Sequence, residues 1–364
     1  MATKYNLISA DSHVFEPGDL WQKYTEKKYL SQAPRLVKQG GDDVIVADWG
    51  LGSSPGMGAS AGKKAEDVKL RGNYSDIRPG TYDPVARLKD MAMDGVDAEV
   101  IYPTVGMSLY RAPDAAVMMA LFRAYNDWLV DFVKVGPEKY VGIGVINTDP
   151  VDEAVKEVER SAKRGLRGVM IPAAPNPDKP FSTKHYDPIW QAASDAGLPV
   201  SLHTFAAPVS AVSVNDWCVT YSVATMQIQT SISAMIFSGV FERFPKLRLV
   251  SVENDVSWAP NLMERMDHAY NRHRFWAGTQ LMSGKLPSAF FKDHVYMTFV
   301  RDIGAAPMRN IIGLGNIMWS SDYPHSDTSW PNSRKLIAEQ FASVPPAELH
   351  HILAGNVAKL YHMN

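Results

Sequence analysis

Residues 6–13, NLISADSH, and residues 247–254, LRLVSVEN, show the pattern that decides the fold, which is a short apolar run followed by polar residues. Six further runs have this form: AEVIYPT (98–104), YVGIGVINT (140–148), LRGVMIPA (166–173), LPVSLHT (198–204), HVYMTFV (294–300) and NIMWSSDYPH (316–325). Amphipathic stretches separate most of them, at 84–94, 115–135, 151–164, 186–196, 221–244, 259–274 and 305–312. Strands rich in Val, Ile and Leu that alternate with helices are typical of a parallel sheet covered by helices. Eight such units predict an α/β fold, a distorted (β/α)8 TIM barrel, and a doubly wound open sheet is the alternative.

Residues 22–82 interrupt this alternation directly after the first strand, and we interpret them as an insertion within a single domain spanning residues 1–364. Most of the segment, residues 40–80, is rich in Gly and Ser and is too long for an ordinary barrel loop. Long loops at an active face often serve as lids. We therefore expect a flap, with a small hairpin near residues 44–48.

Net charge, the length of the apolar runs and the cysteine content indicate which kinds of binding partner and which cellular compartment to expect. The formal net charge is −2, and no run of Lys and Arg with interleaved aromatic residues could follow a phosphate backbone, so we expect no nucleic-acid partner. The apolar runs are far shorter than the roughly 20 residues that span a bilayer, so we expect no membrane partner. Because Cys218 is the only cysteine and the first residues do not resemble a signal peptide, we expect a cytoplasmic protein.

Ionisable side chains follow several of the predicted strands. Asp11 and His13 stand two positions apart, so on a strand both would point to the same side. His203 follows the fifth run, Glu253 the sixth and Asp322 the eighth. Taken singly, each has a simpler explanation, as a solvated strand end, a hydrogen-bonded core histidine or the cap of a turn.

Taken together, these groups predict a metal site. The carboxyl ends of barrel strands meet at one mouth, where two imidazoles and three carboxylates would be costly to bury without a cation. Imidazole and carboxylate ligands suit zinc, manganese or iron, and there are no thiolate ligands for a structural zinc cage. We expect one divalent ion, with zinc as the first choice, that activates a water molecule for catalysis.

Four blocks, ADSHVFEPGDLW, FERFPKLRLVSVEN, MWSSDYPHSD and ILAGNVAKLY, resemble the second amidohydrolase family. This branch of the amidohydrolase superfamily includes amino-carboxymuconate-semialdehyde decarboxylase, resorcylate decarboxylases, and hydrolases and lactonases of aromatic-ring breakdown. The resemblance runs from residue 8 to about residue 362. It implies a distorted barrel with one metal, held by Asp11, His13, His203 and Asp322, with Asp322 also handling the proton of the water.

Two positions differ from the decarboxylases of that family. Asp11 stands where the decarboxylases carry His or Glu, which is a mild change. Glu253, within Val252-Glu253-Asn254, stands where they carry a His. A carboxylate at this position adds negative charge where a carboxylate substrate would bind. We therefore favour hydrolysis over decarboxylation, with Asp322, Glu253 and His203 as the catalytic residues.

The expected function is that of a metal-dependent hydrolase acting on a small, ring-bearing or ring-derived substrate. A metal-dependent carboxy-lyase for an aromatic or muconate-type acid is the first alternative, and a catalytically silent binding barrel is the second. By analogy with the family we expect a homodimer. Candidate substrate-binding residues lie at or near the strand ends and are Phe15, Tyr102, Arg111, Trp258, Arg301 and His325, with Arg71, Trp217 and Met226 as further candidates. Each of the aromatic residues could equally be a core residue, and each arginine a surface one.

Overall fold

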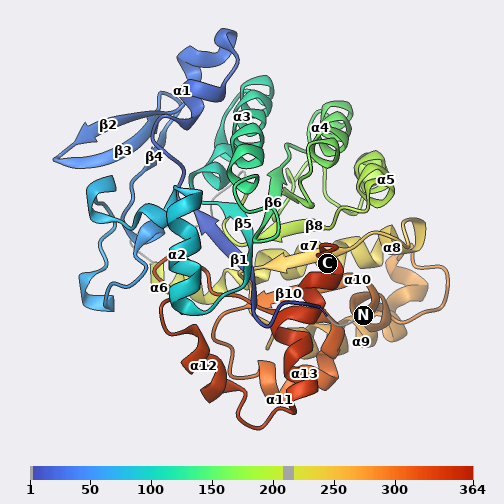
Figure 1. Ribbon diagram of the computed structural model, residues 1–364. Coiled ribbons are helices and arrows are strands. Elements are labelled where there is room, and N and C mark those ends of the chain that lie inside the picture. The colour runs from blue at the N-terminus through green and yellow to red at the C-terminus, as the bar shows by residue number, and fades with distance from the viewer. Residues whose placement is uncertain (1–2, 208–216, 364) are drawn as a thin grey trace.

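The computed structural model describes residues 3–207 and 217–363, and its centre is a sheet of eight parallel strands (Figure 1). The strands follow one another in chain order, each paired with the next: β1 (Ile8–Val14), β5 (Ala98–Pro103), β6 (Tyr140–Val145), β7 (Gly168–Ile171), β8 (Val200–His203), β9 (Leu249–Val252), β10 (Val295–Phe299) and β11 (Ile317–Trp319). This confirms the predicted barrel and excludes a doubly wound open sheet, in which the strand order would reverse.

The first and last strands meet beyond the end of β11 and bring the barrel close to closure. The Ser321 N–H donates to Ser9 Oγ at 2.8 Å, and the Asp322 N–H donates to the Asp11 carbonyl at 3.1 Å. The His13 N–H donates to the Tyr323 carbonyl at 2.6 Å. These bonds join the segment around Asp11 directly to the segment around Asp322, although more than 300 residues separate them in the chain.

Helices cover the outside of the barrel. Their bounds are α1 (Leu20–Tyr24), α2 (Pro84–Asp94), α3 (Ala115–Val133), α4 (Val151–Lys163), α5 (Asp187–Ala196), α6 (Trp217–Val223), α7 (Thr225–Phe237), α8 (Val240–Arg243), α9 (Ala259–Ala277), α10 (Pro287–His294), α11 (Ala305–Ile312), α12 (Ser333–Gln340), α13 (Pro346–His350) and α14 (Asn356–Leu360). No described helix is both long and apolar enough to cross a membrane.

The helix expected over residues 221–244 is divided into α6, α7 and α8. Gly239 has a φ of 71°, in the left-handed region, and separates the end of α7 at Phe237 from the start of α8 at Val240. A left-handed glycine at a helix end is a common stop signal that a purely apolar periodicity does not reveal.

The inserted segment after β1 contains a small antiparallel sheet of β2 (Arg35–Gln39), β3 (Asp42–Ala47) and β4 (Leu51–Ser53), which projects from the barrel beside α1 (Figure 1). The expected hairpin near residues 44–48 is therefore part of a three-stranded sheet. Most side chains of β2 are exposed, so its sequence lacked the apolar alternation that marks a strand.

The later part of the insertion packs on the barrel mouth. The Ser60 and Ala61 N–H groups both donate to the Pro324 carbonyl, at 2.8 and 3.0 Å. The Tyr74 hydroxyl donates to the Glu16 carbonyl at 2.5 Å. These bonds attach the insertion to the loops that follow β1 and β11. Its action as a lid stays a prediction.

Candidate metal centre

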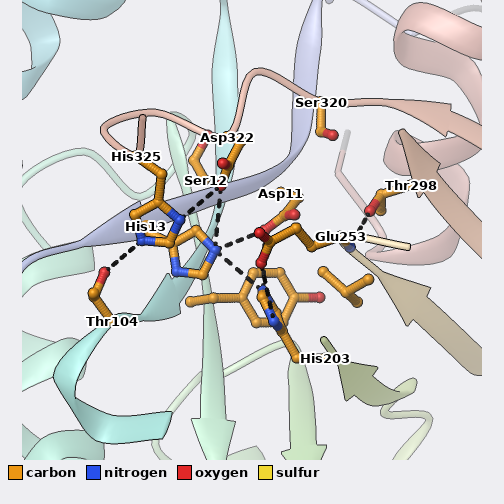
Figure 2. A network of polar contacts seen from close by, with 12 residues as sticks. Asp11, Ser12, His13, Thr104, His203, Glu253, Thr298, Ser320, Asp322 and His325 are labelled. Atoms are coloured by element: carbon orange, nitrogen blue, oxygen red, sulfur yellow. Dashed lines mark hydrogen bonds and ion pairs between the residues drawn. The ribbon is translucent and has the colours of Figure 1, made fainter. Parts of the chain in front are cut away.

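The four predicted ligands lie together at the carboxyl ends of β1, β8 and β11 (Figure 2). His13 Nε2 lies 3.3 Å from Asp11 Oδ1 and 3.5 Å from Asp322 Oδ1. His203 Nε2 lies 3.5 Å from Asp11 Oδ1 and 3.1 Å from His13 Nε2. All four side chains are fully buried. The fold thus gathers two imidazoles and two carboxylates from three strand ends into one small, buried volume.

The hydrogen bonds of the two histidines show which ring nitrogens face the centre. His13 Nδ1 donates to the Pro103 carbonyl at 2.8 Å, and His203 Nδ1 donates to the Thr204 carbonyl at 2.9 Å. Because a carbonyl only accepts, each neutral ring carries its proton on Nδ1 and has a lone pair on Nε2. Main-chain bonds of this kind orient histidines for metal binding.

These four residues fit a divalent cation. Within the described residues, both carboxylate oxygens of Asp11 and both of Asp322 are buried and have no hydrogen-bond partner. Nitrogen and oxygen ligands about 2.0–2.2 Å from one ion lie about 3 Å from each other, in keeping with the separations found here. Two facing lone pairs and four unpaired carboxylate oxygens are costly to bury, and a shared cation would remove that cost.

Glu253 supplies a third carboxylate at the edge of the cluster. Its Oε2 atom lies 3.6 Å from His203 Nδ1 and has no hydrogen-bond partner among the described residues. Both Glu253 and Asp322 have left-handed backbone, with φ values of 52° and 51°. Non-glycine residues rarely adopt this conformation unless the surrounding structure holds them there, and such residues concentrate at functional sites.

The protonation equilibria show that the cluster is short of positive charge. Burial and the charge of Asp322 raise the pKa of Glu253 well above its usual value, and burial and the charge of Asp11 do the same for Asp322. Burial alone would raise the pKa of Asp11, but His13 and His203 lower it overall. Burial and the nearby His325 lower the pKa of His13 to about 3, so this ring is a neutral ligand at neutral pH. For His203, burial is outweighed by Asp11 and Glu253, which raise its pKa.

His325 completes the wall of the cluster beside Asp322. Its ring stacks on His13 with centroids 3.9 Å apart, and its Nδ1 atom lies 3.1 Å from Asp322 Oδ1. Burial lowers the pKa of His325 to about 4. The side chains of Glu253 and His325 are each 12% exposed, whereas the four predicted ligands are fully buried. These two residues therefore mark the side of the cluster nearest to solvent, which we call its open side.

Two buried charged residues that support the centre were not predicted from the sequence. The Arg87 side chain, on α2, donates to Glu99 Oε2 at 2.5 Å and to the His13 carbonyl at 2.6 Å. These two bonds hold the end of β1 in place. Glu16 accepts bonds from the N–H groups of the loop that follows β5. In the sequence, the one available signal was that each of these charged residues adjoins an apolar one. Arg87 precedes Leu88, and Glu16 follows Phe15.

The structure does not bring most of the other predicted substrate residues into the cluster. Tyr102 comes closest, with its ring 5.1 Å from that of His203, and its hydroxyl is 3.0 Å from Ser201 Oγ inside the barrel. The Trp258 ring packs edge-on against Phe291, 5.9 Å away, in the outer helices. The remaining candidates lie outside the cluster: Phe15 is buried against Tyr74, Trp217 stacks on Phe205, and Arg71, Arg111, Met226 and Arg301 are exposed. Their roles in substrate binding stay predictions.

Residues 67–363 match the family described as amidohydrolase. The chain belongs to the amidohydrolase family. A curated relative, a 2-amino-3-carboxymuconate-6-semialdehyde decarboxylase from Dictyostelium discoideum, is 24% identical over 200 residues, which are 54% of this chain and 55% of the relative. The match thus spans about half the length of that relative.

Solved structures show the same amidohydrolase fold. An amidohydrolase from Mycobacterium avium subsp. paratuberculosis K-10 superposes with a TM-score of 0.80 at 21% identity, covering 99% of this chain and 100% of that chain. A dihydroxybenzoic acid decarboxylase from Polaromonas sp. JS666, solved with bound manganese, superposes with a TM-score of 0.66 at 16% identity, covering 99% and 98%.

Proposed function

We propose that this chain is a metal-dependent hydrolase that uses an activated water molecule to cleave a small, uncharged, ring-bearing substrate. The observation that carries this proposal is the third carboxylate. One divalent cation would balance Asp11 and Asp322, which leaves the charge of Glu253 at the open side of the centre. Since like charges are strongly unfavourable at this depth, an ester, lactone or amide fits this centre better than a free acid.

Asp11, His13, His203 and Asp322 would hold the metal. When bound, a divalent ion supplies Lewis-acid polarisation of a carbonyl group and makes a water molecule more acidic. Asp322 has two buried oxygens without hydrogen-bond partners, so it can accept the proton of the attacking water and return it to the leaving group. His13 and His203 keep fixed orientations throughout, because their Nδ1 atoms stay bonded to main-chain carbonyls.

Glu253 is suited to proton transfer on the substrate side. It touches His203, its Oε2 atom lacks a hydrogen-bond partner among the described residues, and it lies on the open side of the centre. Its carboxylate, ionised beside a bound cation, could accept a proton during the reaction and pass it on to the leaving group.

A carboxy-lyase that acts on an aromatic or muconate-type acid is the second candidate. The similarity to a decarboxylase from Dictyostelium discoideum favours it. Such a reaction would benefit from a cation near the substrate carboxylate. In the described part of the chain, the candidate arginines Arg71, Arg111 and Arg301 are exposed, whereas the four predicted ligands are fully buried. For this reason we place hydrolysis first.

Product analysis separates the two reactions. Purified protein loaded with zinc or manganese is incubated with paired compounds that share one aromatic ring and carry either a free carboxylate or an ester, lactone or amide. Acid release from the uncharged members supports hydrolysis. Carbon dioxide release from the acids, with no turnover of their uncharged partners, overturns it. No turnover in either arm, with no metal retained, would instead support a binding barrel without catalysis.

Zinc as the resident metal and a homodimer are further parts of the proposal. The two imidazoles and two carboxylates suit zinc, and they also suit manganese or iron. Near the end of α9, Phe275 and Trp276 are 82% and 76% exposed, which supports a partner surface there. Metal analysis and light scattering test these two points. The predicted cytoplasmic location stays a prediction.

A further inference from the structure

A bulge in β1 lies between Ser9 and Ser12 and gives Asp11 its direction. Ser9 and Ser12 are three positions apart, but they pair with residues of β5 that are only two apart. In a regular strand, side chains three positions apart point to opposite faces, yet the Ser12 hydroxyl donates to Ser9 Oγ at 2.8 Å. The extra residue therefore turns Ser9 to the face of Ser12, away from the face that Asp11 shares with His13. Bulges of this kind often direct a side chain beside an active site.

The Ser9 hydroxyl is fully buried and uses all of its hydrogen-bonding positions. It donates to the Asp11 carbonyl at 2.8 Å, and it accepts the Ser321 N–H and the Ser12 hydroxyl, each at 2.8 Å. A serine hydroxyl has one donor and two acceptor positions, so these three bonds occupy them all. The Ser321 hydroxyl, 3.2 Å from Ser12 Oγ, adds a further link. Ser9 thus connects the bulge of β1 to the chain that follows β11.

The same bonds hold the backbone of Asp322. The Ser321 N–H, directly before Asp322, donates to Ser9, and the Asp322 N–H donates to the Asp11 carbonyl at 3.1 Å. The left-handed φ of 51° at Asp322 is one that an aspartate keeps only where its surroundings impose it. The Asp11 carbonyl accepts bonds from both Ser9 and Asp322, so it is the point at which the two ligand segments join.

We propose that Ser9 is a positioning residue of the metal centre. Its hydroxyl fixes the bulge of β1 to the left-handed turn at Asp322 and so sets how the carboxylates of Asp11 and Asp322 converge. Ser9 acts through the backbone of these two residues. The inference rests on the ligand set of the proposed function, but not on the type of reaction that the centre performs.

Removing the hydroxyl should weaken metal binding. In Ser9→Ala, the Asp11 carbonyl loses one of its two donors and the Ser321 N–H loses its buried acceptor. The two ligand segments can then shift relative to each other. Because partners of metal ligands typically change metal affinity by about 10- to 100-fold, we expect zinc to bind at least about tenfold more weakly.

Ser333→Ala is the matched control. Ser333 is also fully buried, and its hydroxyl also joins distant parts of the chain, because it donates to Asp94 and so links the end of α2 to the start of α12 in the outer helices. The zinc affinity of both full-length variants is measured by competition with a coloured chelator. The visible spectrum of bound cobalt(II) reports the ligand geometry, which a general loss of stability would not change. Neither measurement needs a substrate.

We expect both variants to keep the circular dichroism of the wild type and to lose similar amounts of stability in urea. Ser9→Ala alone should bind zinc more weakly and change the cobalt(II) spectrum. Equal zinc affinity in Ser9→Ala and Ser333→Ala would overturn the inference, whether or not the wild type hydrolyses the proposed substrates. A Ser9→Ala chain that does not fold, beside a folded Ser333→Ala chain, would also overturn it, since the role of Ser9 would then be purely structural. A wild type that binds no zinc would overturn the metal centre itself.

Discussion

His13 and His203 point their Nε2 atoms at each other across 3.1 Å, while each ring donates its Nδ1 proton to a main-chain carbonyl. With both rings neutral, as metal binding requires, no proton lies between the two Nε2 atoms. Asp11 lies within 3.5 Å of both Nε2 atoms and offers only further lone pairs. A cation between these groups accounts for the geometry, and this relationship is the basis of the predictions that concern the metal.

Replacing one carboxylate ligand should weaken metal binding. In Asp11→Asn, a neutral amide replaces the charge next to both histidines, and we expect at least about tenfold weaker binding, measured by competition with a coloured chelator. Asp19→Asn is the matched control, because Asp19 is exposed and pairs with Lys23 on the surface. Equal metal affinity in the two variants would remove Asp11 from the ligand set.

Glu253→Gln should reduce hydrolysis without removing the metal. The amide has nearly the same size but cannot exchange a proton, and general acid or base groups typically contribute about 10²- to 10⁴-fold to rate. Steady-state kinetics and metal analysis of the same preparation check this. A variant with full activity would exclude a proton-transfer role for Glu253, and a variant without metal would assign it as a ligand.

Breaking the buried pair of Arg87 and Glu99 should cost far more stability than breaking a surface pair. Arg87 is fully buried, so Arg87→Met leaves the Glu99 carboxylate without its partner, and we expect a loss of about 3–5 kcal/mol in the free energy of unfolding. Arg35→Met, which breaks the exposed pair with Asp48, should cost about 1 kcal/mol or less.

Urea unfolding of the wild type and both variants measures this difference. Adding Glu99→Leu to Arg87→Met should recover part of the loss, since two apolar side chains can replace a buried ion pair. Equal effects of Arg87→Met and Arg35→Met would contradict the importance of the pair beneath β1.

His294 should make stability depend on pH. Burial lowers its pKa below the usual 6.5, and its ring stacks on Phe241 while Nδ1 donates to the Leu247 carbonyl. The unfolded chain then binds the proton more readily than the folded chain, so this contribution is present above about pH 6.5 and is lost as the pH falls. The free energy of unfolding should fall less between pH 7 and pH 5 in His294→Asn than in the wild type. The same fall in both proteins would contradict this assignment.

The barrel and the residues at its mouth were predictable because their signals are local. Each strand is a short apolar run, and a residue at the end of such a run, such as His203 or Asp322, lies at the mouth whatever its neighbours are. The supporting contacts have no local signal. Thr104 and His325, which share a hydrogen bond, are 221 residues apart in the chain. Arg87 donates to the His13 carbonyl from a helix whose sequence shows only ordinary amphipathic spacing. The substrate candidates were the weakest predictions, because an aromatic residue near a strand end, such as Trp258, can equally face the outer helices.

Metal content is the measurement that tests the central claim most directly. Elemental analysis of purified full-length protein, after dialysis against metal-free buffer, should give about one divalent ion per chain for the wild type. In His203→Ala the ion should be lost while circular dichroism shows the same fold. A wild-type chain that holds no divalent ion and is not stabilised by added zinc or manganese, or a His203→Ala chain that holds as much metal as the wild type, would contradict the metal centre proposed here.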